Sequence, residues 1–170
     1  MRPNFLSLHS VTRIADRVQQ ALGWLLVTLM SVMVVDVTWQ VASRFIVQAP
    51  SSFTEELAGF LLIWIGLMGA AYGFRTRAHL GIDLLVTRLR GGWRLGAEMA
   101  AHVLVILFAL TTMVGGGIQL VRVAFRLEQI SAAMGIRVGI VYLALPLSGV
   151  LVILFAAERM VKTMAGREGP

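Results

Sequence analysis

Cysteine is absent from this chain of 170 residues, so disulfide bonds and thiolate chemistry are excluded. Charged residues are scarce as well, at 14%, whereas 58% of the residues are hydrophobic and the mean hydropathy is +0.81. Soluble domains average about 45–50% apolar residues. The composition therefore places the chain among membrane proteins, and its length suits one small helical domain.

Motifs for catalysis are lacking too. The sequence contains no internal repeat, phosphate-binding glycine loop, metal-ligand cluster or nucleophile triad, so we expect neither an enzyme nor a cofactor. The net charge of +6 does not predict nucleic-acid binding, because the arginines lie in short segments between long apolar runs. Such charges commonly mark the cytoplasmic loops of membrane proteins. The expected surroundings are a lipid bilayer, with no nucleic acid.

Four long apolar stretches predict an all-α membrane protein with four transmembrane helices, built as a single integral membrane domain over residues 1–170. The helices are expected at about 20–45, 55–74, 96–114 and 138–158. Amphipathic stretches at about 79–90 and 118–130 are predicted as interfacial helices, the second alternatively as a bent extension of the third helix. The triple glycine at 115–117 is expected to break or loosen that helix, and Pro146 to kink the fourth.

Polar residues near the end of the first helix form a candidate functional cluster. Asp36, Gln40 and Arg44 recur at every fourth position and share one helix face. A short turn brings Glu55 and Glu56 beside them, so we expect a polar cluster near the outer face. An acid in hydrocarbon usually faces protein or water. Asp36 is open to three interpretations: contact with another helix or membrane protein, a local pair, or a proton-coupling carboxylate as in small four-helix exporters.

The histidines invite a metal, catalytic or haem interpretation. His79 and Asp83 are four residues apart in the basic connection after the second helix, and we expect a local structural pair there. His102 stands four residues after Glu98 and suggests an axial haem ligand, as in four-helix respiratory anchors. That fold normally needs a second histidine at matching depth, which this sequence does not supply.

The stretch from Phe53 to Leu85 carries a resemblance to a known family. An acid pair precedes an apolar helix with Trp64 at its centre, and a Gly-Ala-Ala segment and an H-x-G-x-D tail follow in order. Another helix backbone could approach closely along a row of small residues: Gly66, Gly69, Ala70 and Gly73. Together these pieces resemble the small membrane subunit of tripartite ATP-independent periplasmic (TRAP) transporters.

This resemblance implies a helper subunit in the bacterial inner membrane. A larger membrane subunit would hold the substrate and sodium sites, and a periplasmic binding protein would deliver an organic acid, such as a C4-dicarboxylate or sugar acid. The small subunit would enlarge the scaffold against which the large one moves. Two other classes stay open: a self-sufficient proton-coupled exporter using Asp36, and a haem-bearing respiratory anchor.

The distribution of positive charge predicts the orientation in the membrane. Lys and Arg gather in the N-terminal tail, in the segment after the second helix and in the C-terminal tail. Positively charged segments are retained on the cytoplasmic side. We therefore expect both termini in the cytoplasm.

Overall fold

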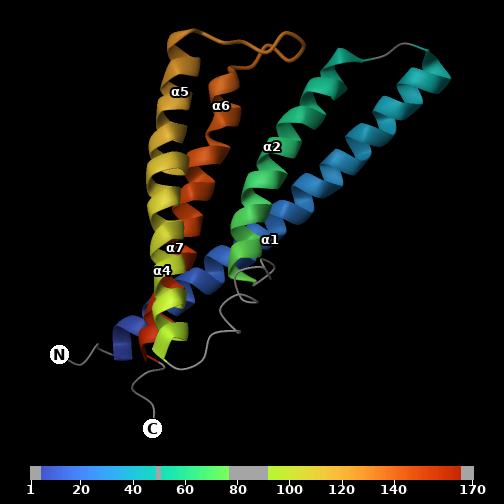
Figure 1. Cartoon of the computed structure of the whole chain (residues 1–170). Helices are drawn as coiled ribbons and strands as arrows, with labels where there is room; N and C mark the ends of the chain where they lie inside the picture. The colour runs from blue at the N-terminus through green and yellow to red at the C-terminus, as the bar shows by residue number, and fades with distance from the viewer. Residues whose placement is uncertain (1–4, 49–50, 77–91, 166–170) are drawn as a thin grey trace.

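The computed structural model describes residues 5–48, 51–76 and 92–165, which form four long helices (Figure 1). The first comprises α1 (Phe5–Ala42) and the π-helical turn η1 (Ser43–Val47), and the second is α2 (Ser52–Arg75). The third joins α4 (Gly92–Phe108), π-helical η2 (Ala109–Gly116) and α5 (Gly117–Arg126), and the fourth joins α6 (Val138–Tyr142) and α7 (Ala144–Ala165). All four are long and apolar enough to cross a membrane, which confirms the predicted class.

The helix ends differ from the expected ranges mainly in the first and third helices. The first helix begins at Phe5 rather than near residue 20, so the basic N-terminal region continues into the span. The triple glycine does not break the third helix, which continues to Arg126, but Gly115 and Gly116 lie in its π-helical part η2, which is wound more loosely than an α-helix. Residues 118–126 of the predicted stretch 118–130 therefore extend the third helix, which was the second of the two alternatives, and residues 127–130 lie in the loop that follows. The other predicted amphipathic stretch, 79–90, lies outside the described residues.

Three glycines explain why the triple-glycine region stays helical. A Cβ added to Gly149 would lie 2.7 Å from the Cβ of Met113, and one added to Gly117 would lie 2.9 Å from Cδ of Pro146. A Cβ added to Gly139 would lie 2.9 Å from the ring of Phe125. These glycines let the backbones of the third and fourth helices approach closely, and this packing offsets the low helix propensity of glycine.

The fourth helix is interrupted where the sequence predicts a kink. α6 ends at Tyr142 and α7 begins at Ala144, with Leu143 between them. Pro146 follows closely, and a proline ring clashes with the carbonyl four residues earlier, which here belongs to Tyr142.

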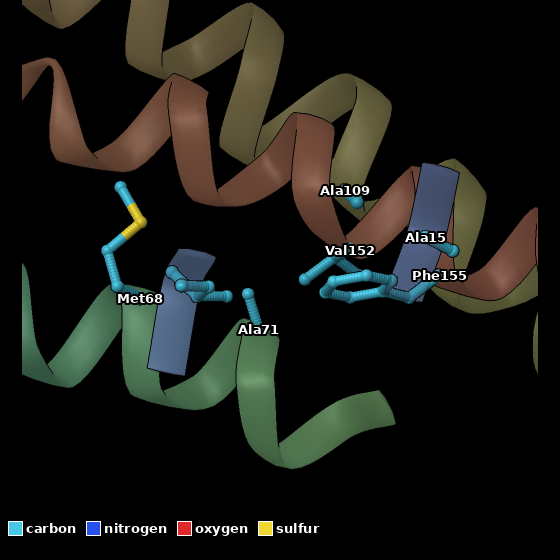
Figure 2. Close-up of a cluster of buried hydrophobic side chains, with 7 residues drawn as sticks. Ala15, Met68, Ala71, Ala109, Val152 and Phe155 are labelled. Atoms are coloured by element: carbon cyan, nitrogen blue, oxygen red, sulfur yellow. The ribbon is translucent and has the colours of Figure 1, made fainter. Parts of the chain in front are cut away.

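The core of the molecule lies around α7. In the most apolar part of the fourth span 44% of the residues are buried, against 11% in the first and third, so α7 is the central helix. Figure 2 shows Val152 and Phe155 of α7 next to Ala71 of α2, with Met68 farther along α2 in the same cluster. Ala15 of α1 and Ala109 of η2 complete this side of the cluster.

The helices form two pairs that meet at one end of the molecule and diverge toward the other (Figure 1). One pair is α1 with α2, and the other is the third helix with the fourth. We call the end that carries Phe5 and Ala165 the terminal end, and the end that carries residues 127–137 the loop end. Contacts of α1 within the described residues are with α2 and, to a lesser extent, α7.

A seven-residue repeat runs along the contact between α1 and α2. On the first helix, α1 and η1 together, the buried or half-buried positions include every seventh residue: Ala15, Leu22, Leu29, Asp36 and Ser43. On α2 the buried positions show the same spacing at Thr54, Leu61 and Met68. This spacing keeps one seam facing the partner in a left-handed helix pair. The seam is apolar in its first part and becomes polar toward the loop end.

Candidate functional site

The terminal end holds a buried charged cluster centred on Arg75, the last residue of α2. Arg75 Nε donates to Oε2 of Glu158 at 2.9 Å and Nη2 to Oε1 of Glu158 at 3.0 Å. Nη2 also donates to Asp16 Oδ1 at 2.6 Å, and Nη1 donates to the side-chain oxygen of Gln19. These bonds tie α2 to α7 and to α1. The side chains of Arg75 and Glu158 are only 9% and 3% exposed.

Further contacts complete this cluster. Lys162 Nζ lies 2.7 Å from Oε1 of Glu158, and Arg159 donates to the backbone carbonyl of Arg75 at 3.2 Å. The Arg75 guanidinium lies 5.4 Å from the ring centre of Phe155. A buried ion pair is stabilising only when its remaining hydrogen bonds are satisfied, and here they are. We interpret the cluster as a structural clasp that holds three helices together.

No motif along the chain marks this clasp, although the sequence carries a signal for it. α2 and α7 run in the same direction, and Arg75 and Glu158 each follow a long apolar run. If two parallel helices are known to be neighbours, opposite charges at the same depth in the membrane predict an ion pair between them. The missing information was that these two helices are neighbours.

Glu56 has a different role from the one predicted. Its carboxylate accepts hydrogen bonds from the Ser131 hydroxyl and from the backbone N–H groups of Ala132, Ala133 and Met134, the last three at 3.0–3.1 Å. Glu56 therefore anchors the loop between α5 and α6 to α2. Gly135, with φ of +68°, supplies the left-handed residue that closes this turn.

The predicted five-residue polar cluster is therefore only partly assembled. Arg44 is exposed and its guanidinium lies 5.8 Å from the ring centre of Phe45, and within the described part of the chain no ion pair joins it to an acid. Glu55 is exposed. The prediction failed for Arg44 because eight residues in a helix of 3.6 residues per turn leave it about 80° around from Asp36. Gln40 remains on the seam and is half-buried.

The other predicted residues have mixed outcomes. Trp64 is half-buried against the core around α7. Nothing in the described part of the chain lies within 4 Å of a Cβ added to Gly66, and Ala70 is exposed, whereas a Cβ added to Gly69 would lie 4.0 Å from Leu26 Cδ2 of α1, so α1 meets only part of that row of small residues. His79 and Asp83 lie outside the described residues.

Asp36 differs from Glu56 and Glu158 in the hydrogen bonding of its carboxylate. It is only 7% exposed, and its Oδ2 is fully buried with no hydrogen-bond partner among the described residues. The neighbouring hydroxyls donate elsewhere: Ser31 to the Val27 carbonyl at 2.8 Å, and Thr54 to the Ser51 carbonyl at 2.9 Å. Buried polar groups are normally hydrogen-bonded, so this carboxylate needs an explanation.

A groove lies over Asp36 between α1 and α2 near the loop end. Its volume is about 550 Å³, and its walls are mainly apolar, with Trp39 and Phe53 among them. A second hollow of about 520 Å³ along α1 shares Ser31 with it and continues over Val27, Met30 and Val34. Together they make a furrow along α1 that ends over one buried carboxylate. We call the part over Asp36 the Asp36 groove.

Comparison with known proteins points to one family. The family described as "Tripartite ATP-independent periplasmic transporters, DctQ component" matches residues 32–166. A putative TRAP transporter small permease protein of Haemophilus influenzae is 23% identical over 89% of this chain and 92% of its own length. The sialic acid TRAP transporter small permease protein SiaQ of Vibrio cholerae is 25% identical, over 94% of this chain and 88% of its own. The isethionate TRAP transporter permease protein DctMQ of Oleidesulfovibrio alaskensis is 26% identical over 86% of this chain, but this match covers only 24% of that protein.

Proposed function

The chain belongs to the family of DctQ components of TRAP transporters, the small permease proteins, and from this membership we propose that it braces a large membrane subunit during sodium-coupled uptake of an organic acid. It is a multi-pass protein of the inner membrane. In this proposal the large subunit carries the substrate and sodium sites, this chain needs no cofactor, and a periplasmic binding protein delivers the substrate.

The exposed apolar surface is the observation that carries the bracing role. Large apolar side chains are exposed along much of α1 and of the third helix, for example Val35 at 69% and Leu104 at 64%. α7 by contrast is well covered by the other helices. A chain with one central helix and long uncovered helices offers wide faces to lipid or to a larger membrane protein. In the DctMQ relative, the matching region is joined to a much longer permease chain.

The placement of charge argues against a substrate site in this chain. Within the described residues, every Lys or Arg of a span lies within about two turns of a span end. Binding a carboxylate at mid-membrane requires converging donors or exposed helix N-termini from broken helices. The buried acid Asp36 would repel an anion. The binding site for the organic acid is therefore assigned to the large subunit.

Reconstitution in liposomes tests this function. The large subunit, the binding protein and this chain together are expected to accumulate a radiolabelled organic acid under an inward sodium gradient. Leaving out this chain is expected to abolish uptake. Accumulation by this chain alone would overturn the proposal and revive the exporter that uses Asp36.

We further propose that both termini face the cytoplasm, on the basis of the positive charges around them. The chain has no cysteine, so single cysteines report accessibility without background. An impermeant thiol reagent added to intact cells is expected to label Ala133→Cys and to leave Arg90→Cys unlabelled. The opposite pattern would reverse the orientation.

A further inference from the structure

The Asp36 groove combines two features that rarely occur together without a ligand. The groove opens sideways between two membrane-spanning helices, and its floor is a carboxylate whose Oδ2 has no hydrogen-bond partner among the described residues. A buried charge without a partner is costly, especially in a membrane. Such a residue normally marks a contact that the isolated chain does not make.

We propose that the Asp36 groove receives an arginine side chain from a transmembrane helix of the large membrane subunit, and that this guanidinium pairs with Asp36. The inference rests on the proposed function, because it requires that a larger membrane subunit binds here. It adds to that function the place of contact on this chain and the chemistry of the group that binds.

The chemistry of the groove favours a guanidinium over a metal ion. Sodium and divalent cations require several oxygen ligands, whereas the groove is lined mainly by apolar side chains and offers one carboxylate beside three hydroxyl residues, Ser31, Ser51 and Thr54. No group of three or more acidic, histidine or cysteine side chains that suits a metal occurs in the parts of the chain that the structure describes. One carboxylate in apolar walls offers two oxygens in one plane, which matches the planar fork of an arginine.

The aromatic side chains of the groove support the same choice. Trp39 on α1 is 58% exposed and Phe53 on α2 is 49% exposed, and both line the groove. A guanidinium stacks on aromatic faces and is more weakly hydrated than an ammonium, so it enters such a site at lower cost than lysine. Asp36, Trp39 and Phe53 therefore supply a charge partner and two stacking surfaces.

The furrow along α1 indicates that the arginine belongs to a helix. Below the groove, the adjoining hollow follows exposed apolar residues of α1, including Val27 and Val34. A transmembrane helix lying in this furrow would cover apolar surface along its length and would place one side chain over Asp36. A free soluble cation would make no favourable contact with the apolar part of the furrow.

Photo-crosslinking identifies the occupant directly. A benzophenone amino acid replaces Val35, which lines the groove, or Leu104, which is similarly exposed on α4. The complex of this chain with the large subunit of the same organism is irradiated in the membrane. The Val35 probe is expected to crosslink the large subunit within one helical turn of an arginine, whereas the Leu104 probe is expected to crosslink lipid or a different segment of that subunit. Lipid adducts only at Val35, or crosslinks from Val35 to a segment with no arginine within one helical turn, would overturn the proposal.

Substitution of Asp36 separates a partner contact from an internal structural role. Asp36→Asn is expected to speed dissociation from the large subunit by about tenfold or more, because the arginine loses its charge partner. The isolated chain is expected to keep or gain thermal stability, because no hydrogen bond of Oδ2 within the described residues is lost. Glu55→Gln removes an exposed acid at the same end and is the matched control, with neither property changed.

The outcomes also distinguish this inference from the proposed function. If the wild-type chain does not copurify with the large subunit, the proposed function fails. If the wild-type chain copurifies and Asp36→Asn binds equally well, or destabilises only the isolated chain, the groove contact alone is wrong. In a charge-exchange test, Asp36→Arg in this chain is combined with replacement of the crosslinked arginine of the large subunit by Asp. This combination is expected to restore at least part of the lost binding.

Discussion

At the terminal end, Arg75 joins α1, α2 and α7 through two acids, whereas at the loop end α1 and α2 leave Asp36 without a hydrogen-bond partner for its buried oxygen among the described residues. The two sites have comparable burial: the Glu158 side chain is 3% exposed and Asp36 is 7% exposed. They differ in whether the chain itself supplies the opposite charge.

This difference shows how one small helical protein can combine a rigid end with an end suited to a partner. Where three helices converge, a long arginine side chain reaches acids on two neighbours, and the buried charges of Arg75 and Glu158 are paired with each other. Where these two helices diverge from the other pair, no third helix among the described residues packs beside Asp36 to supply a donor (Figure 1). The apolar part of the seam between α1 and α2 thus packs within this chain alone, whereas the polar part leaves Oδ2 of Asp36 without a hydrogen-bond partner among the described residues.

Removing the centre of the clasp is expected to have the largest effect. Arg75→Ala leaves Glu158 buried with only the exposed amine of Lys162 as an ion-pair partner among the described residues, and should lower the free energy of unfolding by about 3 kcal/mol or more. Thermal or denaturant unfolding in detergent measures the loss. Lys162→Ala is the control, since its side chain is 56% exposed and surface pairs contribute about 1 kcal/mol or less. Equal effects of the two substitutions would contradict the clasp.

A glycine-to-alanine substitution adds one methyl group. It compares the close contact between the third and fourth helices with the uncovered surface of α2 at Gly66. Gly149→Ala places a Cβ 2.7 Å from Met113 Cβ and should destabilise the protein by about 1–3 kcal/mol. Gly66→Ala meets nothing within 4 Å and should be neutral or stabilising by up to about 1 kcal/mol in the isolated chain. The same unfolding measurement applies, and a loss at Gly66 as large as at Gly149 would mean that α2 packs more closely than described.

The loop end can be tested through the loop that Glu56 anchors. Glu56→Gln removes a charged acceptor of three backbone N–H groups and should cost about 1–2 kcal/mol locally. Hydrogen exchange at residues 132–134 is expected to become about tenfold faster, since 1.4 kcal/mol corresponds to tenfold. Glu55→Gln, one residue earlier and exposed, should leave the exchange rates unchanged. Unchanged exchange rates in Glu56→Gln would mean that the loop does not depend on the Glu56 carboxylate for its stability.

The smallest effect is expected for the pair that the sequence suggested and the structure separates. Arg44→Ala and Glu56→Ala should have additive effects on stability within about 0.5 kcal/mol, because the two side chains have different neighbours. A double-mutant cycle on unfolding in detergent measures this. A coupling clearly above that value would restore the direct pair that we reject.

The membrane class and the family were determined by the sequence alone. Hydropathy over four long stretches decides the class because a chain in lipid must satisfy its backbone hydrogen bonds within each helix. The ordered features from Phe53 to Leu85 were enough to indicate the TRAP small-subunit family, which the family match over residues 32–166 confirms. Both properties depend on local sequence, so no knowledge of helix neighbours was needed.

Only the tertiary structure decided which charges meet. Arg75 and Glu158 are 83 residues apart, and Glu56 and Ser131 are 75 apart, so no spacing rule along one helix connects them. The same applies to Gly117 and Gly149, whose close neighbours lie on another helix. A sequence pattern places a side chain on one face of its helix, but the rotation and packing of the helices determine which neighbour it meets. For Oδ2 of Asp36 that neighbour is missing among the described residues, which the sequence pattern alone could not show.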